Sequence, residues 1–339
     1  MGKIADFVDE QDNLAIQQFQ NLVPSIVAVL QRCIDTGDDE GVGKIFEVFD
    51  DLLLLEAPLL AKHFVELIKL FLSIAASQNN EEQVRVQALS FLMWSIMSAK
   101  GKIGKSRLIN PILSAVFKIA AEEEPESRDE DYPAKLAIQV INTLATTYSP
   151  QQVFPDATQL IVNGLRSAEA GDRKASMLSI AVLVEGCAEY MRNHLKDILE
   201  MVVMGMKDSS IIVRRAACMA LGALCDDFED EISAEHATLM PIIFSIVSNN
   251  NQSIHSEALS TLDVMIENLG SEILPYASGL MNCLMQLWNS NERKVQIATT
   301  NCIGSVAFAS SNVCFQVVTN FYRISCLFLN LQLPDYQSC

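Results

Sequence analysis

The chain has 339 residues, half of them hydrophobic, so it can bury a large core. It carries 42 Asp and Glu against 24 Lys and Arg, a formal charge of -18, which argues against docking on nucleic acid or anionic lipid and favours basic protein partners. The nine cysteines form no CxxC pair and follow no secretory signal, which predicts reduced, mostly buried thiols in a protein of the cytoplasm and nucleus.

Apolar residues recur every three or four positions, as between Leu59 and Phe71, and sustained alternation is absent, which predicts an all-α fold. Short polar breaks such as residues 77–80 and 248–251 divide the helices into pairs. An apolar or small residue marks the second helix of each pair, with steps of 42, 50, 41, 38, 41 and 41: Val42, Val84, Ala134, Ala175, Val213, Ile254 and Val295. HEAT and armadillo arrays have this period.

We therefore predict a right-handed α-solenoid of about seven HEAT repeats over residues 1–312, followed by an atypical tail over residues 313–339. The first helices support this assignment, because six prolines fall early in them: Pro24, Pro58, Pro111, Pro155, Pro241 and Pro275. The tail is apolar from residue 313 to 333, yet Gln316, Asn320, Arg323 and Asn330 interrupt it, so a membrane span is not expected.

The step of 50 contains an acidic run from Glu122 to Asp131, with seven carboxylates in ten residues. Insertions in a solenoid map to loops, and so many charges cannot pack in a core. We therefore predict an exposed acidic loop. Such runs are often only solvated, so partner binding is an additional hypothesis.

Residues that could support enzymatic chemistry do not form a recognisable site. The GKS of residues 104–106 lacks the glycine five positions before Gly104, so a basic turn between helices is expected rather than a phosphate loop. The four histidines fall in different repeats without ligand spacing. We expect no enzyme, no cofactor and no metal site. Met191, Met201, Met204 and Met206 are typical of core, and Trp94 and Trp288 could be buried or could anchor a partner.

Several strings taken together resemble the central repeats of the importin-β (karyopherin-β) superfamily, and within it the large importins that carry core histones and ribosomal proteins. They are Glu185-Gly186-Cys187, Met206-Lys207-Asp208, the VRRAACMALG of residues 213–222, Asp226-Asp227-Phe228, the HxxLMP of residues 236–241 and Leu274-Pro275-Tyr276. The resemblance covers roughly residues 10 to 312.

The resemblance implies a transport receptor whose second-helix surface and acidic loop bind basic cargo, with nuclear pore proteins as further partners. In that family the N-terminal repeats bind GTP-bound Ran. No such block is evident here, so the chain resembles a fragment of a longer array. The cargo-binding candidates are polar residues of the loop and of successive second helices: Glu122, Glu123, Glu124, Glu126, Asp129, Glu130, Asp131, Asn142, Glu185, Asp226, Asp227, Glu267 and Asn301.

A scaffold of the phosphatase-regulatory type is the alternative function. Such a protein grips folded subunits through the turns between repeats. It predicts binding that is insensitive to salt and shows no preference for basic peptides, whereas ion pairs to basic cargo weaken with salt.

Overall fold

The computed structural model describes residues 8–125, 130–249, 254–288 and 290–309. The chain divides into two compact units, residues 1–201 and 202–339, and each is considered by itself. The expected tail from residue 313 lies outside the described residues, so a domain boundary at residue 312 stays a prediction.

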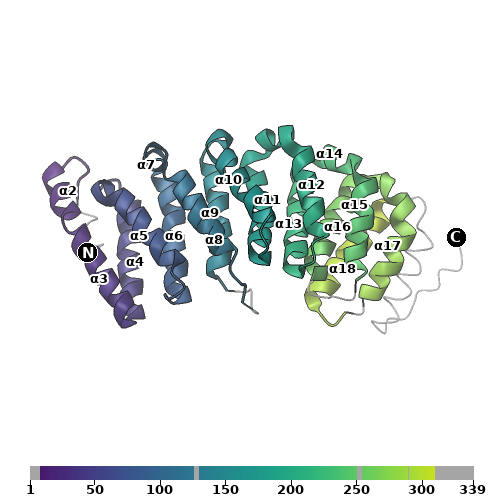
Figure 1. The fold of residues 1–339 in the computed structure, drawn as a ribbon, viewed down its shortest axis with the longest axis horizontal. Coiled ribbons are helices and arrows are strands. Elements are labelled where there is room, and N and C mark those ends of the chain that lie inside the picture. Colours follow the sequence, from purple (N-terminus) through teal and green to yellow (C-terminus); the bar gives the residue numbers. More distant parts are fainter. Residues whose placement is uncertain (1–7, 126–129, 250–253, 289, 310–339) are drawn as a thin grey trace, which may run out of the picture. The chain divides into compact units, whose positions relative to one another are not determined.

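Unit 1 is an array of helices placed side by side (Figure 1). Its elements in chain order are α2 (Asn13–Gln20), α3 (Val23–Thr36), α4 (Asp39–Leu54), η1 (Ala61–His63), α5 (Phe64–Ala76), α6 (Glu82–Ser98), α7 (Lys100–Lys105), α8 (Ile109–Ala120), α9 (Pro133–Thr147), α10 (Pro150–Leu165), α11 (Ala170–Met191) and η2 (Arg192–His194).

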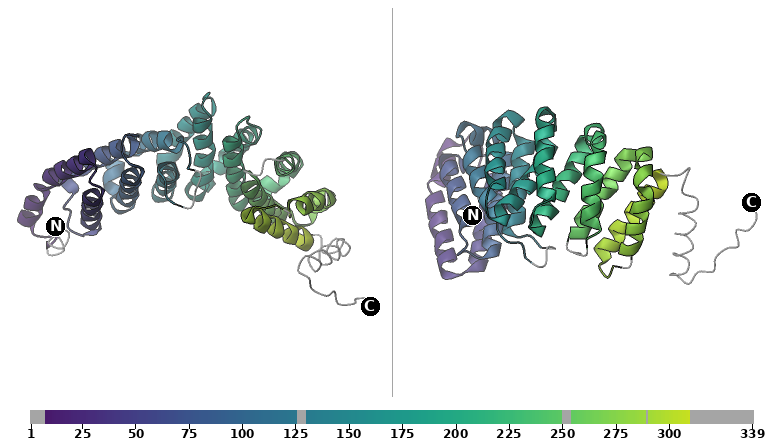
Figure 2. Two further views of the ribbon diagram at one scale, coloured as in Figure 1. Left: turned by 90° about the horizontal axis from the view of Figure 1, so that it is seen from below. Right: turned by 45° about the vertical axis from the view of Figure 1, so that its right-hand side comes forward.

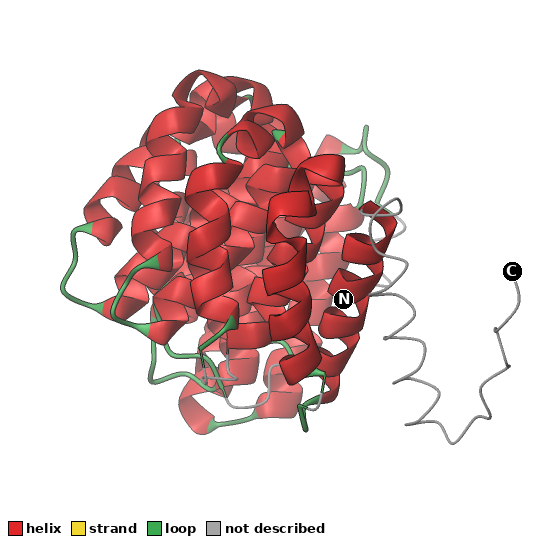
Figure 3. Ribbon diagram, turned by 90° about the vertical axis from the view of Figure 1, so that its right-hand side faces the viewer, coloured by secondary structure: helices red, strands yellow, loops and turns green. Residues whose placement is uncertain are grey.

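Unit 2 repeats the same plan. The division between the units falls within α12 (Leu195–Met206). The elements that follow are α13 (Ile211–Asp227), α14 (Glu229–Ala234), α15 (His236–Val247), α16 (His255–Leu269), η4 (Gly270–Ile273), α17 (Leu274–Leu287) and α18 (Arg293–Ala309). No strand occurs in the described ranges (Figure 3), so the all-α prediction is confirmed there.

The described helices form seven pairs along the chain, as the period predicts: α3 with α4, α5 with α6, α8 with α9, α10 with α11, α12 with α13, α15 with α16, and α17 with α18. The second helices of neighbouring repeats pack on one another in unit 1 as α4, α6, α9 and α11, and in unit 2 as α13, α16 and α18. In unit 1 the first helices α5, α8 and α10 form another layer (Figure 2). All seven residues that mark the period are buried at or near the start of a second helix.

Local sequence signals explain where helices start and stop. The Asp12 carboxylate accepts from the backbone N–H groups of Leu14 and Ala15 at 3.1 and 3.0 Å and caps α2. Gly37, with φ of 65°, ends α3 in the left-handed conformation that glycine adopts without strain.

The prolines follow the prediction with one exception. Pro24 and Pro275 lie in the first turns of α3 and α17, and Pro155 and Pro241 lie inside α10 and α15. Placing Pro58 early in a first helix was wrong, because that residue lies in the connection before η1.

The core of the first two repeats is aromatic. Phe49, Phe71 and Phe91 are fully buried, and the ring centroids of Phe71 and Phe91 lie 4.0 Å apart. Phe49 meets Phe71 edge-on at 5.4 Å. Because the three rings come from α4, α5 and α6, their contact joins one helix pair to the next.

A clamp recurs at the turn between the two helices of four repeats. In each, a side chain early in the second helix contacts a backbone carbonyl six positions earlier: Arg173 contacts Ser167 O, Arg214 contacts Asp208 O, His255 contacts Asn249 O and Gln296 contacts Ser290 O, at 2.6 to 3.1 Å. The four side chains are 41 positions apart. They satisfy carbonyls that the first helix or its turn leaves without an intrahelical partner, which explains the arginine of the VR string in α13.

Candidate functional site

The acidic connection between α8 and α9 begins with a buried ion pair rather than a solvated loop. The Arg85 guanidinium of α6 donates to both carboxylate oxygens of Glu122, at 2.6 and 2.8 Å, and its Nε donates to Ala75 O at 2.7 Å. The two side chains are only 9% and 19% exposed. Nη2 makes both bonds to Glu122, and with the Nε bond to Ala75 O they fix the position of the guanidinium.

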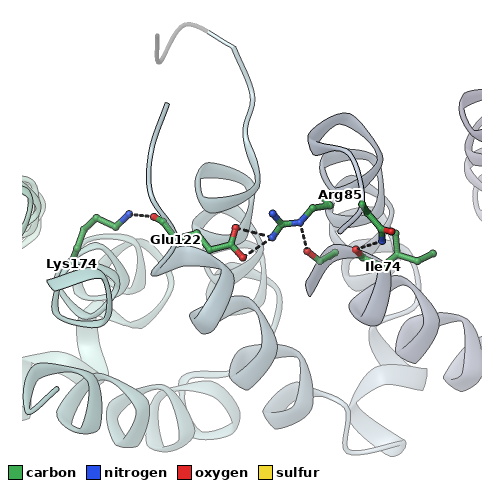
Figure 4. A network of polar contacts seen from close by, with 6 residues as sticks. Ile74, Arg85, Glu122 and Lys174 are labelled. Carbon is green, nitrogen blue, oxygen red and sulfur yellow. Dashed lines mark hydrogen bonds and ion pairs between the residues drawn. The ribbon is translucent and has the colours of Figure 1, made fainter. Parts of the chain in front are cut away.

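Lys174, early in α11, approaches the same connection from the other side (Figure 4). Its Nζ donates to Glu122 O at 2.6 Å and lies 3.4 Å from the Glu124 carboxylate. The lysine side chain is 2% exposed, so its charge depends on these oxygens for compensation. The start of the acidic run therefore ties together α6, α8 and α11.

The expectation of a wholly exposed acidic loop is consequently wrong for Glu122 and Glu124. Buried cations from neighbouring repeats compensate their charges. Glu123, Glu130 and Asp131 are exposed, as expected, and Asp131 pairs with Lys135 at 2.9 Å. Two further candidates lie outside the described residues: Glu126 and Asp129.

Asn142 and Glu185 meet on neighbouring second helices of unit 1. The Asn142 amide donates to the exposed Glu185 carboxylate at 2.8 Å, from α9 to α11, and Asn142 Oδ1 is buried without a hydrogen-bond partner in the described chain. The helices can approach closely here because a Cβ at Gly186 would lie 2.2 Å from Ala145 O. A spacing of 43 residues therefore brings polar side chains together on this surface.

The unit 2 candidates lie on its three second helices. Asp226 and Asp227 are the last two residues of α13, both exposed, and burial followed by the neighbouring Asp227 raises the pKa of Asp226. Glu267 of α16 and Asn301 of α18 are also exposed. Ser305 Oγ donates to Asp263 at 2.7 Å and lies 3.4 Å from Glu267, so it links α16 to α18 near these candidates.

Sequence reasoning missed an acidic surface that follows Asp227 directly. We call residues 226–235 the α14 edge. This segment holds Asp226, Asp227, Glu229, Asp230, Glu231 and Glu235, which is six carboxylates in ten residues. Glu229, Asp230 and Glu235 are exposed. A count of charges along the sequence would have found the α14 edge, because its density of carboxylates nearly equals that of residues 122–131. A carboxylate at the end of α13 also opposes the helix dipole, so helix stability does not explain it.

The methionines, tryptophans, cysteines and GKS residues considered in the sequence analysis differ in how exposed they are. Met191 and Met206 are buried, as expected of core, whereas Met204 is 73% exposed. Trp94 of α6 is half exposed, and Trp288 is partly buried. All six cysteines in the described ranges are buried free thiols. The GKS residues belong to α7 and the turn after it.

Among the described residues no group of three or more His, Cys, Asp or Glu side chains is placed to hold a metal. In that same part of the chain no helix has the length and apolar character needed to cross a membrane.

Residues 172–224 match the HEAT-like repeat family. The chain is 31% identical over 299 residues to the probable importin subunit beta-4 of Schizosaccharomyces pombe, covering 88% of this chain and 28% of that protein. It is 30% identical over 246 residues to importin-4 of Mus musculus, covering 67% and 23%. The chain thus spans between about a fifth and a third of the length of these relatives.

Solved structures of Kap121p have the same fold. The complex with RanGTP has a TM-score of 0.79 at 21% identity, covering 97% of this chain and 34% of that protein. A Kap121p variant in which three acidic residues are replaced by lysine has a TM-score of 0.77 at 22% identity, covering 92% and 32%. With the sequence likeness to two importins and the described array of helix pairs, the chain belongs to the importin-β superfamily.

Proposed function

We propose that this chain holds basic cargo, such as histones or ribosomal proteins, as part of a nuclear transport receptor that moves between cytoplasm and nucleus. The formal charge of -18 and the carboxylates exposed on both units support basic partners. GTP-bound Ran and nuclear pore proteins are further proposed partners, because related structures show Kap121p bound to RanGTP and to Nup53p.

One observation carries the proposal. The three acidic residues replaced by lysine in the Kap121p variant are 43 and 42 positions apart. Asn142, Glu185 and Asp227 have the same two separations in this chain. Within unit 1 the hydrogen bond between Asn142 and Glu185 shows that such a separation places side chains next to one another on consecutive second helices. A reversal of charge at such positions is a direct way to repel a basic ligand.

Binding of this kind depends on many weak contacts. An exposed ion pair contributes about 0 to 1 kcal/mol, so useful affinity needs several pairs, and added salt weakens it. A single change such as Asp227→Ala should therefore matter little. Together, Glu185→Lys and Asp227→Lys should lower affinity about tenfold or more, since each replaces attraction by repulsion.

The test is fluorescence anisotropy of a lysine-rich histone-tail peptide titrated with the full chain at about 50 and 200 mM salt. We expect saturable binding that weakens with salt and is about tenfold or more weaker in the double variant. Glu66→Lys with Glu200→Lys is the charge-matched control, because both residues are exposed on first helices. No binding at low salt, or equal loss in the control, would overturn the proposal.

A further inference from the structure

We propose that the α7 edge, formed by Lys100, Lys102, Lys105 and Arg107, binds an acidic segment of a partner protein. This surface has the opposite charge to the cargo surface proposed above and lies entirely within unit 1. It is a second binding site, for a partner that the cargo site would repel.

The sequence around the α7 edge is locally basic in an acidic protein. No Asp or Glu occurs between Glu82 and Glu122, although the whole chain carries 42. All four cations of the edge are exposed. None of them has a carboxylate partner among the described residues, whereas Arg85 and Lys174 of the same unit do.

Two of the lysines lie close to buried aromatic rings. Lys100 Nζ lies 5.8 Å from the ring centroid of Tyr148, whose hydroxyl donates to Lys100 O at 3.1 Å. Lys102 Nζ lies 5.6 Å from the ring centroid of Phe64, at the start of α5. Ile103 is fully buried and anchors α7 between them. These contacts favour side-chain positions close to the rings, which reduces the entropy that binding must lose.

Arg107 occupies a position that favours glycine. Its φ is 53°, the only positive φ of a non-glycine residue in the described chain. The bonds Arg107 N to Gly104 O, at 3.2 Å, and Leu108 N to Ile103 O, at 3.1 Å, close the end of α7. An arginine is strained in this conformation, so stability does not explain its presence. A cation after a helix C-terminus offsets the helix dipole, but α7 has only six residues, so this effect at Arg107 is small beside the strain of its left-handed conformation.

The geometry favours a short acidic segment from another protein. The acidic connection of the same unit begins after α8, at the opposite end of that helix from the α7 edge (Figure 1). The 12 residues of α8 span about 18 Å, so this connection is not the segment that we propose as the ligand. The net charge of -18 repels long polyanions such as nucleic acid. α7 itself is about 9 Å long, which suits a segment of a few carboxylates.

The experiment titrates the full chain into a fluorescent peptide of six glutamates with Gly-Ser flanks, at about 50 mM salt. We expect saturable binding that falls at least tenfold when Lys100, Lys102 and Lys105 become Gln. The matched control replaces exposed lysines of first helices, Lys69, Lys118 and Lys196, with Gln, and should bind as the parent does.

Arg107→Gly alone separates binding from folding. Glycine adopts the left-handed conformation without strain, so the melting temperature of the Arg107→Gly variant should equal or exceed that of the parent. Its affinity for the peptide should fall severalfold. Absence of peptide binding, or equal loss in the lysine control, would overturn the proposal. Tighter binding of a single-stranded oligonucleotide, lost in the same variants, would overturn it in favour of nucleic acid.

Discussion

The connection between α8 and α9 and the α14 edge have nearly the same density of carboxylates, yet the structure uses them differently. Glu122 and Glu124 face the buried cations Arg85 and Lys174 and hold neighbouring repeats together. At the α14 edge, Glu229 and Asp230 are exposed on a six-residue helix. Acidic runs of similar density therefore differ in how their charges are compensated: buried cations neutralise Glu122 and Glu124 of the first run, whereas Glu229 and Asp230 of the second are exposed.

The largest expected effect is on stability. Glu122→Gln leaves the Arg85 guanidinium buried without its counter-charge and should lower the free energy of unfolding by about 3 kcal/mol. Glu229→Gln, the matched change at the α14 edge, should stay within about 0.5 kcal/mol of the parent. Urea denaturation followed by circular dichroism measures both. Equal destabilisation by the two changes would remove the distinction between the regions.

The next effect is on binding of the lysine-rich peptide. Replacing Asp226, Glu229 and Asp230 with Lys should weaken it about thirtyfold at low salt, because three attractive contacts become repulsive. The same number of replacements at exposed residues of first helices and the N-terminal segment, Glu10, Glu66 and Glu200, should cost less than threefold, a general charge effect. A larger loss in the second variant would locate the binding surface elsewhere.

Acid should weaken the α14 edge before it affects ordinary carboxylates. Burial and the neighbouring Asp227 raise the pKa of Asp226, so this side chain takes up a proton at a higher pH than an unperturbed aspartate and then no longer attracts lysine. As the pH falls, affinity for the peptide should therefore begin to decrease at a higher pH than it would if every carboxylate of the edge were unperturbed. In Asp226→Asn the affinity at pH 7 should be lower and the change with pH shallower, and an unchanged pH profile would contradict the assignment.

Asp50 of α4 supplies a third kind of carboxylate, half-buried with Oδ1 lacking any hydrogen-bond partner in the described chain. Burial, then Asp51 and Glu47, raises its pKa from 3.8 to about 6. Because the folded state disfavours the ionised form, this carboxylate costs stability that grows as pH rises from 4 to 6 and is full above it. Asp50→Asn should therefore raise stability by up to about 1 kcal/mol at pH 7.5, after discounting for solvent screening, and by nothing at pH 4. Melting curves at both values test the sign.

The sequence predicts the architecture well because its signal is periodic. Val213, Ile254 and Val295 mark second helices at a constant step of 41, and helical periodicity needs no knowledge of distant contacts. The position of Pro58 was predicted wrongly, because a proline just before a helix and a proline in the first turn of a helix have similar flanking sequences.

The candidate site is predicted less completely. The partners that neutralise Glu122 and Glu124 lie 37 and 50 positions away, in Arg85 and Lys174, so a count of local charge could not reveal them. A count of local charge could have revealed the α14 edge. It could not have revealed the proposed role of Arg107, because the positive φ of that residue is known only from the folded chain.

The clamp at the helix turns has a consequence for how such chains change in length. Arg173, Arg214, His255 and Gln296 recur every 41 residues, and each contacts the backbone carbonyl six positions before it. Deletion of residues 214–254 would remove 41 residues and put His255 in the place of Arg214. His255 would then lie six positions after Asp208 and could contact the carbonyl that Arg214 contacts now. A gene rearrangement that removes or copies 41 residues between these four side chains would keep the remaining contacts of this kind, so the number of repeats in this part of the array can change without opening a turn.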